Sequence, residues 1–121
     1  MRVLIVDDES LIRMDLRDII ESCGHEVVAE GTNGVEAIKL CKEYKPDIVL
    51  MDVKMLELDG IEAARQIGFH HEAPVVLLTS YSQQDLINKA RESGVYGYLI
   101  KPVREEQLVP TLEMALGRYH S

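Results

Sequence analysis

Two kinds of apolar pattern alternate along this chain, and their alternation limits the folds that are open to it. Helical spacing appears between short apolar runs, as at Ile12, Leu16 and Ile19. Strands that alternate with helices favour right-handed crossovers and a parallel sheet covered by helices on both faces. The sequence therefore predicts an α/β fold with five strands and five helices. The strands are expected at the apolar, largely β-branched runs 2–6, 26–30, 47–51, 74–78 and 98–100.

The expected helices begin and end at recognisable residues. The segments 33–36 and 59–62 each place an acid three residues after a capping side chain, which is typical of a helix N-terminus. A fourth helix is expected over 82–94 and the last from about Arg104, with Pro110 bending its axis. Five strands arranged in this way suggest a doubly wound, flavodoxin-like sheet. The strand order 2-1-3-4-5 is the order known for that class of fold and does not follow from this sequence by itself.

The composition narrows the classes of function. A chain of 121 residues is expected to form one domain, 1–121, and its net charge of −8 argues against direct nucleic acid contact. No apolar run approaches the ~20 residues that span a bilayer, and Met1 leads directly into a strand. We therefore expect a cytoplasmic protein with no membrane contact and no signal peptide. Cys23 and Cys41 fall on apolar helical faces and are expected to be reduced core thiols.

Polar side chains stand where four of the predicted strands end. Asp7 and Asp8 follow the first strand, Asp52 the third, Thr79 the fourth and Lys101 the fifth. Ligands of open parallel sheets bind in the crevice outside the carboxyl ends of the strands. Because crowded carboxylates repel one another, the pattern predicts a divalent cation at this edge, together with a phosphoryl group.

The carboxylate of Asp52 has the chemistry of a phosphoryl acceptor. A strand-end carboxylate can attack phosphorus and hold an acyl phosphate. Because the incoming group is anionic, each like-charge pair at ~4 Å costs ~4 kcal/mol at an effective dielectric of about 20. Mg²⁺ solves this by taking oxygen ligands from carboxylates, backbone carbonyls, water and phosphate. Lys101 and Thr79 can bind phosphate oxygens.

Each of these residues also has a purely structural interpretation. Acids such as those at 7–9 are favoured at helix N-termini, Asp52 could begin a turn, and Thr79 could cap a helix. Lys101 could be a solvated side chain before a turn. Any one of these interpretations is adequate for its own residue, but all four strand ends would then carry suitable groups by coincidence. We therefore favour the functional interpretation.

Four motifs occur in order and at suitable spacing: Leu4-Ile5-Val6-Asp7-Asp8, Met51-Asp52 followed by Asp59-Gly60, Leu78-Thr79-Ser80, and Gly97-Tyr98-Leu99-Ile100-Lys101-Pro102-Val103. Together they resemble the receiver domains of two-component response regulators. The resemblance covers the whole chain, and as a set the motifs are highly specific. It implies a signalling domain that catalyses only its own phosphorylation and dephosphorylation and is not otherwise an enzyme.

The resemblance implies a role for each acid. Asp52 would be the phosphoacceptor, and Asp8, Asp52 and the backbone carbonyl of Lys54 would bind Mg²⁺ directly. Asp7 would act through water.

The resemblance also implies a switch. Thr79 and Lys101 would bind phosphoryl oxygens, the Lys101-Pro102 peptide would be cis, and Tyr98 would turn inward as Thr79 moves toward the phosphate. The phosphoryl donor would be a sensor histidine kinase or a phosphotransfer protein. The output would pass to an effector domain or partner protein, or through a phosphorylation-dependent homodimer.

Two further features bear on the resemblance. Leu56 stands where the family usually has a proline four residues after the phosphoacceptor, which would loosen that loop without removing a ligand. The segments 94–98, 108–110 and 113–116 look like those of receivers attached to ANTAR-type RNA-binding antitermination modules.

Two other classes of protein place comparable residues at strand ends. A Mg²⁺-dependent aspartyl phosphatase of the haloacid dehalogenase type usually has a second acid two residues after its nucleophile, where this chain has Lys54. Such enzymes also need a cap domain or other substrate pocket, for which this chain has little length. A flavodoxin-like FMN protein needs a loop rich in Gly, Ser or Thr after its first strand, whereas the acids at 7–9 would repel phosphate.

Overall fold

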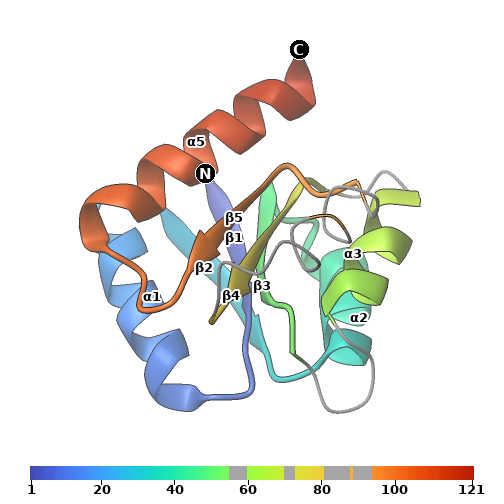
Figure 1. Ribbon diagram of the computed structural model, residues 1–121, viewed down its shortest axis with the longest axis horizontal. Helices are drawn as coiled ribbons and strands as arrows, with labels where there is room; N and C mark the ends of the chain where they lie inside the picture. The colour runs from blue at the N-terminus through green and yellow to red at the C-terminus, as the bar shows by residue number, and fades with distance from the viewer. Residues whose placement is uncertain (55–59, 70–72, 81–87, 89–93) are drawn as a thin grey trace.

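A five-stranded parallel sheet in the order β2-β1-β3-β4-β5 forms the centre of the computed structural model (Figure 1). The predicted sheet order is therefore confirmed. The structure describes residues 1–54, 60–69, 73–80, 88 and 94–121. The strands are β1 (Arg2–Val6), β2 (Glu26–Gly31), β3 (Ile48–Asp52), β4 (Val75–Thr79) and β5 (Gly97–Ile100).

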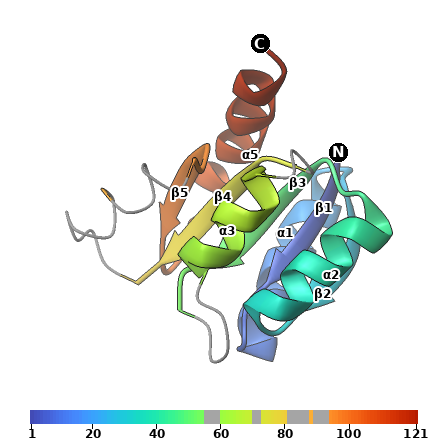
Figure 2. The same cartoon turned by 90° about the vertical axis from the view of Figure 1, so that its right-hand side faces the viewer.

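Helices lie on both faces of this sheet. Those in the described residues are α1 (Ser10–Ser22), α2 (Gly34–Tyr44), α3 (Gly60–Phe69) and α5 (Glu105–His120). α1 and α5 lie against one face, and α2 and α3 against the other (Figure 2). The helix that we expected over 82–94 lies outside the described residues, apart from positions 88 and 94. In the described part of the chain, no helix is long and apolar enough to cross a membrane.

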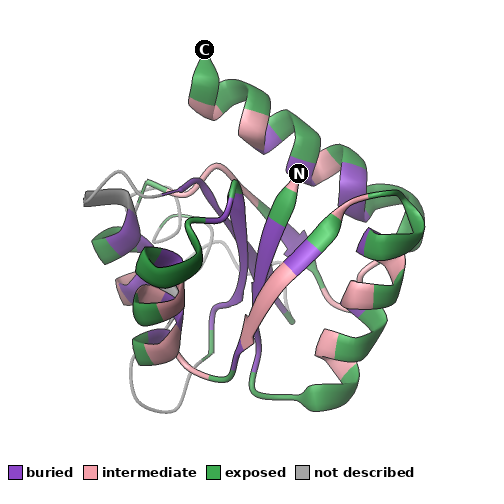
Figure 3. Ribbon diagram, turned by 180° about the vertical axis from the view of Figure 1, so that it is seen from behind, coloured by how far each residue is buried: buried purple, intermediate pink, exposed green. Residues whose placement is uncertain are grey.

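The central strands are buried because helices cover the sheet on each side. Residues 3–6 of β1 are all 0% exposed, and every residue of β3 and β4 is buried (Figure 3). Continuous apolar runs of this kind are typical of parallel strands. Side chains alternate between two clusters: Ile5 packs with Leu16 of α1 in one, and Leu4 with Ala37 of α2 in the other.

The register of the strands brings their carboxyl ends to one edge of the sheet. Asp52 of β3 pairs with Leu78 of β4, and Thr79 of β4 pairs with Ile100 of β5. Since all the ladders are parallel, the residues that directly follow β1 and β5 lie at this same edge. The edge therefore collects polar side chains from segments that are far apart in the sequence.

The ends of α2 follow from its flanking residues. The Asn33 side chain accepts a hydrogen bond from the Glu36 backbone N–H at 2.8 Å, so the predicted cap is present. The Glu36 carboxylate accepts from the Thr32 backbone N–H rather than from that of Asn33, which displaces the reciprocal contact by one residue. Lys45, with φ of 47°, ends the helix in the left-handed region. At the other end of the chain, α5 continues through Pro110 to His120.

The two cysteines differ in their surroundings. Neither Cys23 nor Cys41 is in a disulfide, and Cys41 is buried as expected, but Cys23 is exposed. The expectation of a core thiol was wrong for Cys23 because α1 ends at Ser22. Cys23 is the residue that caps the helix, and its φ of −90° and ψ of 9° are not those of the helix interior. Helical periodicity therefore no longer sets the direction of its side chain.

Candidate functional site

Three carboxylates meet at the carboxyl edge of the sheet. Asp7 and Asp8 follow β1, Asp52 is the last residue of β3, and one oxygen of each lies within 4.8 Å of the others. Asp7 is 0% exposed and Asp52 is 6% exposed, whereas Asp8 is exposed. Two largely dehydrated carboxylates and a third at the surface therefore share one small volume.

Lys101 brings a positive charge into this cluster from the end of β5. Its Nζ lies 2.8 Å from Asp7 Oδ2 and 3.1 Å from Asp52 Oδ2, and its side chain is 14% exposed. The Lys101 backbone N–H donates to the Thr79 carbonyl at 2.7 Å, and the Lys101–Pro102 peptide bond is cis. Without this ammonium, the two buried carboxylates would be uncompensated charges, which are strongly destabilising. Lys101 therefore helps to keep Asp7 and Asp52 together.

The second oxygen of each buried carboxylate is held by the backbone. Asp7 Oδ1 accepts from the Glu9 N–H at 2.9 Å, and Asp52 Oδ1 accepts from the Lys54 N–H at 3.0 Å. Each carboxylate thus uses one oxygen for the loop that follows its strand and the other for Lys101. The acids are therefore fixed in orientation by contacts at both oxygens.

Burial and the neighbouring charges act in opposite directions on the pKa values of Asp52 and Lys101, and both pKa values are raised. Burial raises the pKa of Asp52, and the hydrogen bond from the Lys54 N–H and the charge of Lys101 offset this only in part. For Lys101, burial acts to lower the pKa, but the hydrogen bond to Asp7 and the charge of Asp52 outweigh it, so the pKa is raised. Lys101 therefore stays protonated at neutral pH.

This set of side chains fits a hard divalent cation. All of the candidate donors are oxygens, and their spacing lets them contribute to one coordination sphere. Mg²⁺ binds through one or two carboxylates and keeps several waters. Three carboxylates against one ammonium also leave an excess of negative charge in the cluster, which a divalent cation would offset. The exposed Asp8 leaves the site open to water on one side.

The remaining predicted residues lie on the neighbouring strands. Thr79 ends β4 and is 5% exposed, and its strand lies between those of Asp52 and Lys101. Tyr98 is 41% exposed and Leu99 is 6% exposed, so alternation along β5 turns the Tyr98 ring away from the core. Leu56, which replaces the usual proline, lies outside the described residues.

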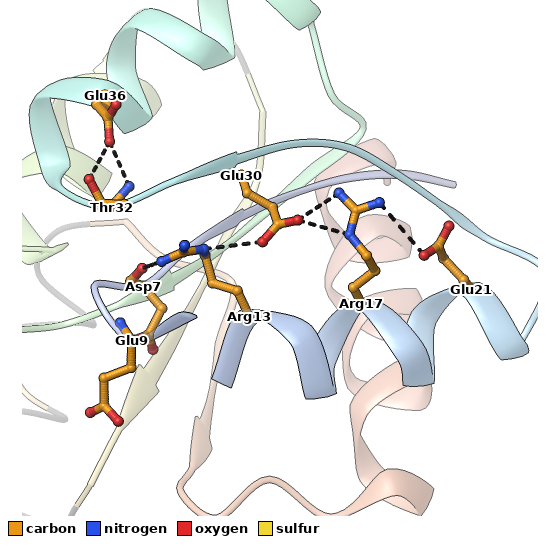
Figure 4. A network of polar contacts seen from close by, with 8 residues as sticks. All are labelled: Asp7, Glu9, Arg13, Arg17, Glu21, Glu30, Thr32 and Glu36. Carbon is orange, nitrogen blue, oxygen red and sulfur yellow. Dashed lines mark hydrogen bonds and ion pairs between the residues drawn. The ribbon is translucent and has the colours of Figure 1, made fainter. Parts of the chain in front are cut away.

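Sequence reasoning did not identify Arg13 as part of this site. Its guanidinium donates to the main-chain carbonyl of Asp7 at 2.6 Å and to Glu30 at 3.1 Å (Figure 4). The signal in the sequence was weak. Arg13 and Arg17 are four residues apart and so share one face of α1, but nothing in the local pattern indicates Glu30 of β2 as their partner.

An apolar hollow of about 350 Å³ lies beside Lys101. Four of its lining residues belong to α1, and two further apolar side chains of that helix, Leu11 and Met14, are strongly exposed. The hollow is lined by Ile12, Asp15, Leu16, Ile19, Ser80, Lys101, Pro102 and Val103.

Known proteins resemble this chain in both sequence and structure. A family model described as the response regulator receiver domain matches residues 3–113. Transcriptional regulatory protein PdtaR of Mycobacterium tuberculosis is 48% identical over 118 residues, which are 98% of this chain and 58% of PdtaR. Chemotaxis protein CheY of Thermotoga maritima is 41% identical over 112 residues, which are 92% of this chain and 93% of CheY. This chain thus spans little more than half the length of PdtaR.

Among solved structures, the signal receiver domain of a modulated diguanylate cyclase from Desulfovibrio desulfuricans superposes with a TM-score of 0.90. It is 33% identical in sequence, and the match covers 98% of this chain and 95% of that one. The likeness therefore extends over the sheet and the residues at its carboxyl edge.

Proposed function

The chain belongs to the receiver-domain family of response regulators, and from this premise we propose that it is a signalling switch phosphorylated on Asp52. The observation that carries the proposal is the position of the Asp52 carboxylate. It ends a buried strand beside the carboxylates of Asp7 and Asp8, and its Oδ2 lies 3.1 Å from the Lys101 ammonium. The proposed nucleophile thus lies next to carboxylates that could bind a cation and an ammonium that could bind an anion.

In the proposed reaction, a carboxylate oxygen of Asp52 attacks the phosphorus of a phosphohistidine. The P–O bond forms as the P–N bond breaks, and the donor imidazole keeps the electron pair. Lys101 moves from its carboxylate partners to a phosphoryl oxygen, and the Thr79 hydroxyl donates to another. The acyl phosphate is later hydrolysed by water, so the domain catalyses only its own phosphorylation and dephosphorylation.

Mg²⁺ is the proposed cofactor. Asp8, Asp52 and the backbone carbonyl of Lys54 would hold it directly, and Asp7 through water. When bound, Mg²⁺ supplies positive charge that offsets the charge of the phosphoryl oxygens. The support in this chain is the all-oxygen cluster with its excess of negative charge.

The proposed phosphoryl donor is a sensor histidine kinase or a phosphotransfer protein in the cytoplasm. The hollow beside Lys101 supports this, because an apolar surface next to the phosphoacceptor can receive a helix that carries the donor histidine. Methyl signals of Ile12 and Ile19 would shift when a donor domain is added. No change on addition of an active donor would contradict this docking surface.

For the output we propose the receiver half of a transcription antitermination regulator. The support is the resemblance of segments 94–98, 108–110 and 113–116 to receivers that carry RNA-binding modules, together with the match to about half of a transcriptional regulatory protein. The net charge of −8 supports an RNA contact made by an effector rather than by this segment. The signal would leave through Tyr98 and the surface around it, by release of an effector or by formation of a homodimer.

The phosphoacceptor can be tested by intact-mass measurement. With Mg²⁺ and a small phosphodonor, the wild-type chain should gain one phosphoryl group that is labile to alkali. Asp52→Asn should gain none, because an amide oxygen is a poor nucleophile. Asp18→Asn is the matched control, since it makes the same chemical change at an exposed position of α1 and should label like the wild type. Full labelling of Asp52→Asn would contradict the proposal.

A further inference from the structure

The guanidinium of Arg13 reaches from the first turns of α1 to the main chain of the acidic cluster. Its Nη1 donates to the Asp7 carbonyl oxygen at 2.6 Å, and its Nε donates to Glu30 Oε1 at 3.1 Å (Figure 4). The Arg13 side chain is only 17% exposed and that of Glu30 only 28%. A largely buried guanidinium thus joins a backbone oxygen of the site to the carboxylate of Glu30.

That oxygen belongs to the peptide group that joins Asp7 to Asp8. Because a peptide group is planar, fixing its oxygen also fixes the direction in which the chain enters Asp8. The Asp7 carboxylate is already held by Glu9 and Lys101, and the Asp7 N–H donates to Gly31 at 3.1 Å. Arg13 therefore acts on the part of the loop that leads to the exposed acid.

Glu30 of β2 in turn fixes Arg13. Glu30 binds Arg13 through Oε1 and uses Oε2 for Arg17, at 2.8 Å from Nε and 2.7 Å from Nη2. A guanidinium offers several N–H groups in a rigid planar fork, so Arg13 can hold two oxygens at once. A lysine ammonium lacks this fork and is a compact point charge on a flexible stem. The contact to Asp7 thus depends on the shape of the side chain as well as on its charge.

We infer that Arg13 is a positioning residue for the divalent cation, because it holds the Asp7–Asp8 peptide so that the Asp8 carboxylate stays with that of Asp52. Arg17 also binds Glu30, but its other partner is Glu21 and not the Asp7 carbonyl, so it does not have this role. The inference rests on the proposed binding of Mg²⁺ by these acids. Groups that orient metal ligands typically change metal affinity by 10- to 100-fold when they are removed.

The test compares Arg13→Met with Arg17→Met. Both variants remove one guanidinium from the same helix and from the same partner, but only Arg13→Met removes the contact to the Asp7 carbonyl. In a Mg²⁺ titration followed by amide chemical shifts, Arg13→Met should weaken Mg²⁺ binding about tenfold. Arg17→Met should bind Mg²⁺ like the wild type. Equal losses in the two variants, or no loss in Arg13→Met, would overturn the inference.

A metal-free measurement separates this inference from the proposed function. Without Mg²⁺, hydrogen exchange at the Asp8 and Glu9 amides should be faster in Arg13→Met than in Arg17→Met, because the loop has lost its anchor. A wild-type chain that bound no Mg²⁺ at the acids would overturn the proposed function. The exchange rates would still decide whether Arg13 holds the loop, and equal rates in the two variants would overturn that part.

Arg13→Lys distinguishes positioning from charge, and it also serves if Arg13→Met does not fold. It keeps a positive charge beside Glu30 but cannot hold both oxygens in the same way. The positioning role predicts a Mg²⁺ affinity well below that of the wild type and faster exchange at Asp8. Full recovery of affinity in Arg13→Lys would show that only the charge matters, and the positioning role would then be wrong.

Discussion

Asp52 is a carboxylate whose surroundings favour its neutral form. Burial raises its pKa, and the hydrogen bond from the Lys54 N–H and the charge of Lys101 only partly compensate. An acid whose pKa is higher in the native state than in the unfolded state binds protons more tightly when folded. Its ionisation therefore lowers the free energy of unfolding as the pH rises from the ordinary Asp pKa of about 3.9 through the raised native value. The residue proposed to react is thus also one that costs stability at neutral pH.

Replacing Asp52 by Asn should accordingly stabilise the fold at pH 7. We expect a rise in the free energy of unfolding on the order of 1 kcal/mol, the usual size of a single-residue effect. The gain should shrink as the pH falls toward about 4, since the wild-type carboxyl then becomes neutral as well. Urea unfolding from pH 7 to pH 4 would measure it, with the exposed Asp18→Asn as a control. A less stable Asp52→Asn at pH 7 would contradict this account.

At the scale of helices and strands, the sequence predicts what depends on local pattern and on parallel topology. Lys101 and Asp7 are 94 residues apart, yet their meeting could be expected because parallel strands end at one edge. The contact of Arg13 with Glu30 could not be expected from the sequence, because it depends on how α1 is rotated against β2. Cys23 was misplaced because helical periodicity was extended one residue beyond the helix.

The N-terminus of α2 offers a test of the local part of this reasoning. Asn33→Ala removes the side chain that accepts from the Glu36 N–H and should lower the free energy of unfolding by about 1 kcal/mol. Asn33→Asp keeps an acceptor and adds a negative charge at a helix N-terminus, so it should be at least as stable as the wild type. Urea unfolding of the three proteins would compare them. Equal stability of Asn33→Ala and Asn33→Asp would show that the cap contributes nothing.

On the scale of the whole molecule, the reactive edge and the proposed output surface belong to neighbouring strands. Thr79 ends β4 and pairs with Ile100 of β5, two residues from Tyr98 along the chain. Tyr98 and Ile100 are 41% and 40% exposed on β5, the last strand of the sheet. A ligand changes such a surface only if it binds one of two conformers better than the other. If Thr79 moves toward the phosphoryl group, the conformer with the Tyr98 ring turned inward would bind that group better than the conformer with the ring turned outward.

Beryllofluoride, a mimic of the phosphoryl group, should therefore change the surface of β5 and α5 when it is added with Mg²⁺. We expect amide exchange in 97–100 and 105–120 to change about fivefold or more, the lower end of usual coupling between sites. Tyr98→Ala should bind the mimic, because the ring is not part of the acidic cluster, but should lose this response.

Sedimentation would decide the form of the output: a larger mass with the mimic indicates a homodimer, and an unchanged mass with altered exchange indicates release of an effector. Unaltered exchange at saturating mimic would exclude the switch, because the phosphoryl site and the β5 surface would then not be coupled.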